Sequence, residues 1–498
     1  MTSLWLDREQ TIATDPFIDQ ARYDTVIVGG GLTGLTTALL LARSGQRVVV
    51  LEARTLAAVT TGNTTGKLSL LHGGQLSQLL HANSPDVARA YVEANREGQQ
   101  WMLRYCHEHQ VPFQERDAFT YAGTPEGADR VQREYEACRM VGLDVTLEAE
   151  TELPYPTWGA VRLADQAQFD PLDVVDALAR DLRLHGGHVV QGAFVTGITR
   201  NASGIETRIG DRLVRSDRVV LATGTPILNR GGHFARLQPL RSYALAFTVP
   251  GPVPLGMYLS IDEPTRSLRT TPTHGTEHLV VGGNGHVVGR QHSALAQVRD
   301  LEAWTAEHFP GAVRTHAWSA QDYRSLDRAP YVGPIVHGDD RIFVATGFNK
   351  WGMTNAVAAS LALSARLLDG AMGWADTLYN RPATLADAGD AVQVNGSVGF
   401  EMAKHWAGQA VAKHPDAAPA EGQGVVFSEG MRPVGLCTVG GDTRKVSAVC
   451  PHMHGVLGWN DAEKTWDCPL HGSRFTHDGR RLEGPALRDL ESITDSPE

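Results

Sequence analysis

Long apolar runs mark the strands expected in the first part of the chain and near its middle. Four of them are continuous and rich in β-branched side chains, as expected of strands buried on both faces. They cover residues 25–28, 47–51, 218–222 and 342–345. Residues 35–44 predict a helix that ends before Gly45, and residues 352–368 predict a second, long helix. This alternation of strands and helices predicts an α/β fold.

Two intervening stretches follow a different pattern, which predicts a second, α+β domain. Residues 73–150 predict a helix over 86–110 and a short strand around 118–121. Residues 232–325 alternate apolar and polar positions, as antiparallel strands do. The expected strands are 242–249, 257–261, 267–271, 278–282 and 315–319. The aromatic stripe of the helix is interpreted as core packing; it comprises Tyr91, Trp101 and Tyr105. A polar-aromatic group either borders a pocket or packs in the core: Trp318, Gln321, Asp322 and Tyr323.

The remaining residues predict a connecting arm and a small β domain. Residues 386–419 contain a predicted helix (Ser397–Ala412) and then a Pro/Ala/Gly-rich segment typical of a domain junction. Short strands alternate with turns from Gly424 onward. We therefore expect a separate all-β unit over residues 420–498.

Two mixed Cys/His motifs in this last unit predict a metal centre. Cys450-Pro-His452 is followed after fifteen residues by Cys468-Pro-Leu-His471. Both thiolates can bind one iron and both imidazoles a second, which gives a cluster with a higher potential than an all-cysteine one. Structural zinc is the alternative, but zinc motifs usually pair Cys with Cys and His with His. His454 is expected not to be a ligand, because the four-ligand set is already complete.

A glycine-rich turn follows the first strand and predicts a dinucleotide site. Gly29, Gly31 and Gly34 have G-x-G-x-x-G spacing, and Glu52 ends the second strand. Such glycines let a pyrophosphate approach the helix N-terminus, and the acid can accept hydrogen bonds from a ribose. A glycine-rich turn of an ordinary α/β fold is the alternative. The motif alone does not distinguish FAD from NAD.

Composition excludes several classes of protein. The chain has 498 residues, enough for two to four structural units, and its hydrophobic (42%) and charged (20%) content is that of a globular protein. A net charge of −11 argues against nucleic acid as a partner. No apolar run is long enough for a membrane helix, and the first residues show no secretion signal. Five cysteines predict no disulfide framework, so we expect a cytoplasmic protein.

Several segments resemble the D-amino-acid-oxidase/glycine-oxidase superfamily of flavoproteins. They are residues 222–224, 345–354, 327–333 (Asp-Arg-Ala-Pro-Tyr-Val-Gly) and 169–171 (Phe-Asp-Pro, which would open a helix before a strand around Val195). The resemblance covers about residues 22–385. It implies a Rossmann-like, glutathione-reductase-type FAD-binding domain from about 22–72, 155–231 and 325–385. The substrate domain would comprise about 73–154 and 232–324.

The resemblance also implies which residues contact FAD. They are Gly29, Gly31, Gly34, Glu52, Thr64, Thr65, Lys67, Val195, Gly224, Gly347, Gly352, Met353 and Thr354. The N-terminus of the last helix would face the pyrimidine end of the flavin, where negative charge develops on reduction. Lys67 would lie near the N5–O4 edge and is the candidate catalytic residue. The alternative is that it is a solvated side chain of a polar loop.

Residues 420–498 resemble a Rieske [2Fe-2S] domain, with Cys450, His452, Cys468 and His471 as the implied ligands. Gly472-Ser-Arg-Phe475 resembles the second cluster loop. High-potential members carry a disulfide whose positions are here Gly455 and Leu470, and a tyrosine where this chain has Phe475. Fewer hydrogen bonds to sulfur stabilise the reduced cluster less, so we expect a potential in the lower part of the Rieske range.

The two resemblances together predict an oxidoreductase. The leading hypothesis is an FAD-dependent dehydrogenase that oxidises a small amine or amino acid and passes electrons singly through the cluster, by way of His452 and His471, to an external acceptor protein. One alternative is a reductase in which a donor protein feeds electrons from cluster to flavin. Another is a non-enzymatic electron carrier or redox sensor.

Overall fold

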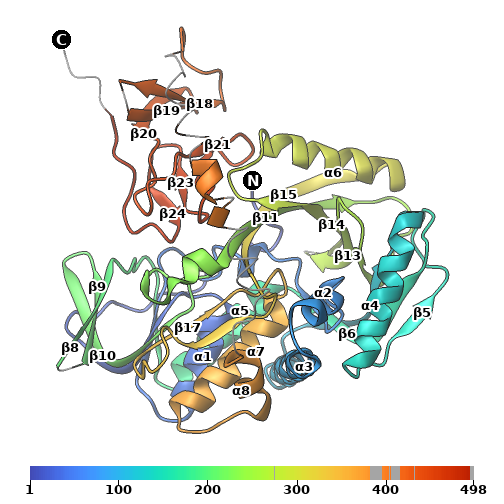
Figure 1. Ribbon diagram of the computed structural model, residues 1–498, viewed down its shortest axis with the longest axis horizontal. Helices are drawn as coiled ribbons and strands as arrows, with labels where there is room; N and C mark the ends of the chain where they lie inside the picture. Colours follow the sequence, from blue (N-terminus) through green and yellow to red (C-terminus); the bar gives the residue numbers. More distant parts are fainter. Residues whose placement is uncertain are drawn as a thin grey trace.

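The four buried runs form the centre of one mainly parallel sheet (Figure 1). The computed structural model describes all residues except 10, 203, 274, 382–394, 397, 403, 405, 407–414, 431 and 494–498. The strand order is β16-β17-β10-β1-β2-β7, with β9 on β10 and β8 on β9. The bounds are β1 Arg22–Val28, β2 Val48–Leu51, β7 His188–Val190, β8 Gly197–Asn201, β9 Gly204–Ile209, β10 Arg212–Leu221, β16 Tyr331–Pro334 and β17 Ile342–Thr346. Strands β1, β2, β7, β10 and β17 are parallel, so their carboxyl ends meet at one edge.

Helices α1 (Leu32–Arg43), α5 (Pro171–Leu184) and α7 (Gly352–Leu367) share a hydrophobic core with this sheet. Helix α5 begins where expected, because the Asp170 side chain accepts a hydrogen bond from the Leu172 N–H and Pro171 occupies the first turn. The strand expected around Val195 is wrong. The ladder with β2 ends at Val190, and Val195 lies in the loop that follows.

The second domain is built on a nine-stranded sheet of order β15-β11-β14-β13-β12-β4-β6-β3, with β5 beside β6. Its strands are β3 Lys67–Leu68, β4 Phe113–Tyr121, β5 Thr146–Glu148, β6 Ala160–Phe169, β11 Leu237–Thr248, β12 Met257–Ser260, β13 Arg266–Thr273, β14 Thr276–Val287 and β15 Val313–Ser325. The five strands expected between 232 and 325 are all present. Strands β3 and β6 also join this sheet, although their residues fall in the ranges expected for the FAD-binding part.

The other helices pack on the second sheet, on the helices named above or on one another. They are α2 Gln75–Ala82, α3 Pro85–Glu108, α4 Ala128–Met140, α6 Ala294–His308 and α8 Gly373–Tyr379, with short 3-10 turns at Thr61–Asn63, Pro125–Gly127 and Arg230–Arg236. Tyr91 and Tyr105 of α3 are buried, which confirms their role in the core. The strand pattern missed α6, which Ser293 caps by accepting from the Ala296 N–H.

The C-terminal unit contains two small antiparallel sheets. The first is formed by β18 Gly424–Glu429, β19 Arg432–Val439 and β20 Asp442–Ser447, and the second by β21 Gly458–Asn460, β22 Thr465–Asp467, β23 Arg474–Thr476 and β24 Arg481–Glu483. Their core includes Trp466 and Phe475, which are fully buried. The predicted helix Ser397–Ala412 lies largely outside the described residues, although residues 398–402 are helical. Within the described part of the chain, no helix is both long and apolar enough to cross a bilayer.

Candidate functional site

The glycine-rich turn is closely packed between β1 and α1. A Cβ atom on Gly34 would overlap the carbonyl oxygen of Gly29, and one on Gly29 would overlap that of Ala222. Gly29 also has a φ of +109°, a conformation that glycine adopts without strain. The turn therefore depends on these glycines and brings the N-terminus of α1 to the edge where the parallel strands end. A pyrophosphate fits this cradle, because unpaired N–H groups and the helix dipole favour an anion there.

Glu52 is held at the end of β2 by backbone hydrogen bonds. Its carboxylate accepts from the N–H groups of Gly30 at 2.7 Å and Arg54 at 2.8 Å. Burial raises the pKa of Glu52, while these two donors act in the opposite direction. A carboxylate fixed in this way at the end of the second strand suits the ribose of an adenine dinucleotide.

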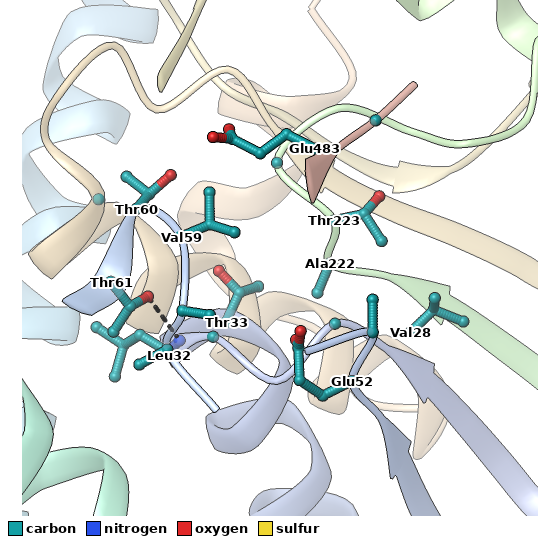
Figure 2. A pocket seen from close by; sticks show the side chains of 18 of the residues that line it. Val28, Leu32, Thr33, Glu52, Val59, Thr60, Thr61, Ala222, Thr223 and Glu483 are labelled. Carbon is teal, nitrogen blue, oxygen red and sulfur yellow. Dashed lines mark hydrogen bonds between the residues drawn. The ribbon is translucent and has the colours of Figure 1, made fainter. Parts of the chain in front are cut away.

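A cavity lies at the carboxyl edge of the parallel sheet (Figure 2). Nine of the expected FAD contacts line it: Gly29, Gly31, Glu52, Thr64, Val195, Gly224, Gly347, Gly352 and Met353. Four do not: Gly34, Thr65, Lys67 and Thr354. Gly34 packs inside the turn, and the Thr354 hydroxyl donates to Asn95 at 2.6 Å. The Thr65 carbonyl accepts from the buried Arg269 at 2.7 Å.

Lys67 points into the second sheet rather than into this cavity. Its ammonium donates to the Tyr258 carbonyl at 2.9 Å and to the Ser267 hydroxyl. Burial, and secondarily the charge of Arg269, lower the pKa of Lys67 to about 7. The structure therefore places Lys67 next to the loop that lines the cavity, but it does not bring its amine to the cavity wall.

The cavity wall also contains residues for which the sequence offered little signal. Of the polar-aromatic group, Asp322 and Tyr323 line the cavity, whereas Trp318 and Gln321 are buried away from it. Lys350 lines the cavity too, in the left-handed conformation (φ +70°) that is uncommon for a side chain with a Cβ. Its backbone N–H donates to Asp322. Burial raises the pKa of Asp322 to about 6, and desolvation lowers the pKa of Lys350.

The four Cys and His residues of the C-terminal unit come together as two pairs of like ligands. The thiols of Cys450 and Cys468 are hydrogen-bonded to each other, and the rings of His452 and His471 lie 5.1 Å apart between centroids. His471 Nδ1 is buried and has no hydrogen-bond partner among the described residues. An orphaned ring nitrogen beside paired thiols and a second imidazole fits a two-iron cluster. No group of three or more such side chains in the described part of the chain could hold one metal ion.

The local environment favours the metal-binding forms of Cys450 and His471, whereas the hydrogen bond with Cys450, and then burial, raise the pKa of Cys468. The hydrogen bond from Cys468 is the main cause that lowers the pKa of Cys450 to about 7, and backbone N–H groups and Ser473 assist. Burial, and then the neighbouring His452, lower the pKa of His471 to about 4. Metal binding requires thiolate and neutral imidazole, and both shifts favour these forms.

Gly455 and Leu470, which stand where high-potential Rieske proteins carry a disulfide, face each other. A Cβ atom on Gly455 would lie 2.6 Å from Leu470 Cδ1 and 3.2 Å from Cys468 Sγ. Ser473 hydrogen-bonds to Cys450, and Phe475, fully buried, has no hydroxyl to donate to sulfur. His454 is exposed, in the left-handed conformation.

The cluster site and the cavity both lie at the contact between the C-terminal unit and the rest of the chain. His452 Nε2 is 2.9 Å from Asn229 Oδ1, and the Phe234 ring contacts the rings of both histidines edge-on. Asn229 and Phe234 follow β10 of the parallel sheet. In the other direction, Leu482, Glu483 and Gly484 of the C-terminal unit line the cavity, where Figure 2 shows Glu483 across from Glu52. None of these contacts has a signal in the sequence.

Models of two protein families match two separate parts of the chain. The model of the FAD dependent oxidoreductase (DAO) family matches residues 24–366, and that of the Rieske [2Fe-2S] domain matches residues 409–494. The Bacillus subtilis protein YhfW, named as a Rieske 2Fe-2S iron-sulfur protein, is 30% identical over 475 residues, which are 94% of this chain and 93% of that protein. Glycine oxidase of Geobacillus kaustophilus is 27% identical over 361 residues, 67% of this chain and 89% of the enzyme.

Solved structures support the fold of the larger part. A crystal structure of glycine oxidase from Geobacillus kaustophilus superposes with a TM-score of 0.63 at 20% identity, covering 74% of this chain and 99% of that one. L-proline dehydrogenase from P. horikoshii gives 0.59 at 16% identity, covering 76% and 99%.

Proposed function

The chain belongs to the FAD-dependent oxidoreductase (DAO) family and carries a C-terminal Rieske [2Fe-2S] domain, and from this premise we propose that it is an amine or amino-acid dehydrogenase whose electrons leave singly through the cluster. The observation that carries the proposal is the shared boundary of the two sites. Residues of the Rieske domain line the flavin cavity, and residues of the flavoprotein contact the cluster histidines. Such a boundary suits electron exchange within one chain.

The substrate class is supported by the relatives and by the charges in the cavity. Glycine oxidase and L-proline dehydrogenase, by their names, act on amino acids. Lys350 brings a cation to the cavity, and the N-terminus of α7 adds positive potential at Gly352 and Met353. Both favour a substrate carboxylate or negative charge that develops during the reaction. When bound, FAD supplies the hydride acceptor, so the residues chiefly have to position the substrate and exclude water.

We keep Lys67 as a candidate catalytic residue, with its amine held in the second sheet beside the loop that lines the cavity. A lysine with a pKa near 7 can exist in either protonation state at neutral pH. A catalytic role predicts that Lys67→Met lowers kcat at least tenfold while FAD content and thermal stability stay close to those of Ser267→Ala, which removes one of its partners. A role confined to packing predicts lower stability with an unchanged kcat per bound FAD.

Anaerobic spectroscopy with a panel of amines and amino acids tests the proposal. A substrate should bleach the flavin first and reduce the cluster second, and Cys450→Ser should stop turnover with a one-electron acceptor protein while leaving flavin bleaching intact. Undiminished turnover of Cys450→Ser would contradict the route through the cluster. Reduction of the cluster before the flavin by a donor protein would favour the reductase alternative. If no compound bleaches the flavin, the chain is better described as an electron carrier or sensor.

A further inference from the structure

The Rieske domain contacts the second sheet through a buried network of ion pairs. Arg241 of β11 is 1% exposed and pairs with Glu463 at 2.8 Å, while Asp467 and Glu483 lie within 3.9 Å of its guanidinium. Arg474 pairs with the same three carboxylates, at 2.8, 3.2 and 2.5 Å. One guanidinium therefore comes from each module. Because these charges are buried, another docking geometry would leave more of them unpaired, so the network favours a single geometry.

A hydrogen-bonded path connects the cavity wall to the second cluster loop across the same contact. The Gln321 amide donates to the Tyr323 hydroxyl and to the Gly472 carbonyl, both at 2.8 Å. Tyr323 lines the cavity, and Gly472 directly follows His471. Gln321 is itself fixed by the Arg241 guanidinium, which donates to its side-chain oxygen at 2.7 Å.

The histidine edge of the cluster site lies against the flavoprotein. Asn229 Oδ1 is placed to accept from His452 Nε2, and the Phe234 ring centroid is 5.5 Å from that of His452 and 5.2 Å from that of His471. The orphaned Nδ1 of His471 points away from solvent, as a metal ligand would. The nitrogens expected to bind iron and the edge covered by the flavoprotein thus belong to the same two rings.

We propose that each module completes the cofactor site of the other: Asn229 and Phe234 form the outer shell of the cluster, and Leu482–Gly484 form part of the wall that encloses FAD. The histidine edge then faces the flavoprotein, so an outside electron partner has to approach the cluster from another side and not, as the sequence led us to expect, by way of His452 and His471. This inference deepens the proposed function, but it concerns which residues surround the cofactors and needs no substrate.

The cluster half is tested by redox titration of the full chain, followed by the circular dichroism of the cluster. An acceptor on a ligand N–H makes the imidazole more electron-rich and stabilises the oxidised cluster. Asn229→Asp should therefore lower the midpoint potential, and Asn229→Leu should raise it. We expect the two variants to differ by at least tenfold in the reduction equilibrium, which is 59 mV for a one-electron couple. Asn229 is exposed, so neither change should impair folding. Asn201→Asp, the same change on exposed strand β8, is the control.

Measurements of FAD affinity test the second part of the proposal, that Leu482–Gly484 help to enclose FAD. Leu482→Asp puts a charge into the cavity wall and should weaken FAD binding at least tenfold, whereas Val425→Asp, on an exposed site of the same domain, should not. An unchanged cluster spectrum shows that the domain is still folded. The proposal is overturned if the Asn229 variants shift the potential no more than the control does, or if Leu482→Asp binds FAD as tightly as Val425→Asp. Neither result depends on an amine substrate, so the proposed function can fail while this inference holds, and the reverse.

Discussion

Replacing Arg241 by methionine should destabilise the docking of the Rieske domain more than the loss of an exposed ion pair would. The substitution keeps the aliphatic bulk but removes hydrogen bonds to Glu463, Gln321 and Ser319. The network holds two guanidiniums and three carboxylates, so its net charge changes from −1 to −2 in a buried place. Removing one partner of a buried ion pair typically costs about 3–5 kcal/mol.

The assay is urea denaturation of the holoprotein, followed by the circular dichroism of the cluster. With a slope near 2 kcal/mol per molar urea, that cost lowers the apparent midpoint by about 2 M. Arg89→Met breaks an exposed ion pair of 2.7 Å in α3 and should cost no more than about 1 kcal/mol. The double variant Arg241→Met with Glu463→Gln should recover part of the loss, since it removes one uncompensated charge.

The same network predicts how pH acts. Burial raises the pKa of Glu463 and of Asp467, but the attraction of Arg474 and Arg241 outweighs it and leaves both pKa values below the ordinary ones. A lowered folded-state pKa contributes stability that is present at neutral pH and is lost as pH falls through that value. Without Arg241 the two pKa values rise, so the acid-induced loss of the domain should begin at a higher pH. If Arg241→Met matches Arg89→Met in both urea and acid, the ion network does not hold the domain.

Three further predictions concern the individual sites. Cys450→Ser should abolish iron and acid-labile sulfide but keep the yellow flavin, whereas Cys437→Ser, a buried cysteine of the same domain whose thiol donates to a backbone carbonyl, should keep both. Gly34→Ala should reduce bound FAD at least tenfold, judged by flavin absorbance, because its Cβ has no room, and Gly373→Ala, with open space around it, should not. The flavin potential should fall more steeply with rising pH through about 6, where the carboxyl of Asp322 ionises beside the cavity, and Asp322→Asn should remove that step.

Local motifs indicated a dinucleotide turn and a set of cluster ligands, whereas the choice of FAD over NAD rested on the family resemblance. The turn at Gly29–Gly34 and the two Cys/His motifs each place their functional atoms within a few residues of one another, so spacing alone reports the geometry. The continuous β-branched runs likewise predicted the parallel strands, because burial on both faces leaves no polar positions. The predicted ends of strands and helices were less accurate, as the loop position of Val195 shows. The end of a strand depends on where its neighbour stops pairing with it.

Only the tertiary structure decided how those sites are completed and joined. The Lys67 ammonium follows β3 into the second sheet, although its loop lies beside the cavity. Asn229 meets His452 across 223 positions of sequence, and Arg241 meets Glu463 across 222. Such contacts arise from the packing of whole domains, in which burial makes each unpaired charge costly, and no periodicity or spacing along the chain records that cost. For this reason the sequence determines which cofactors the protein is built to hold, whereas the packing of its domains determines which residues stand between them.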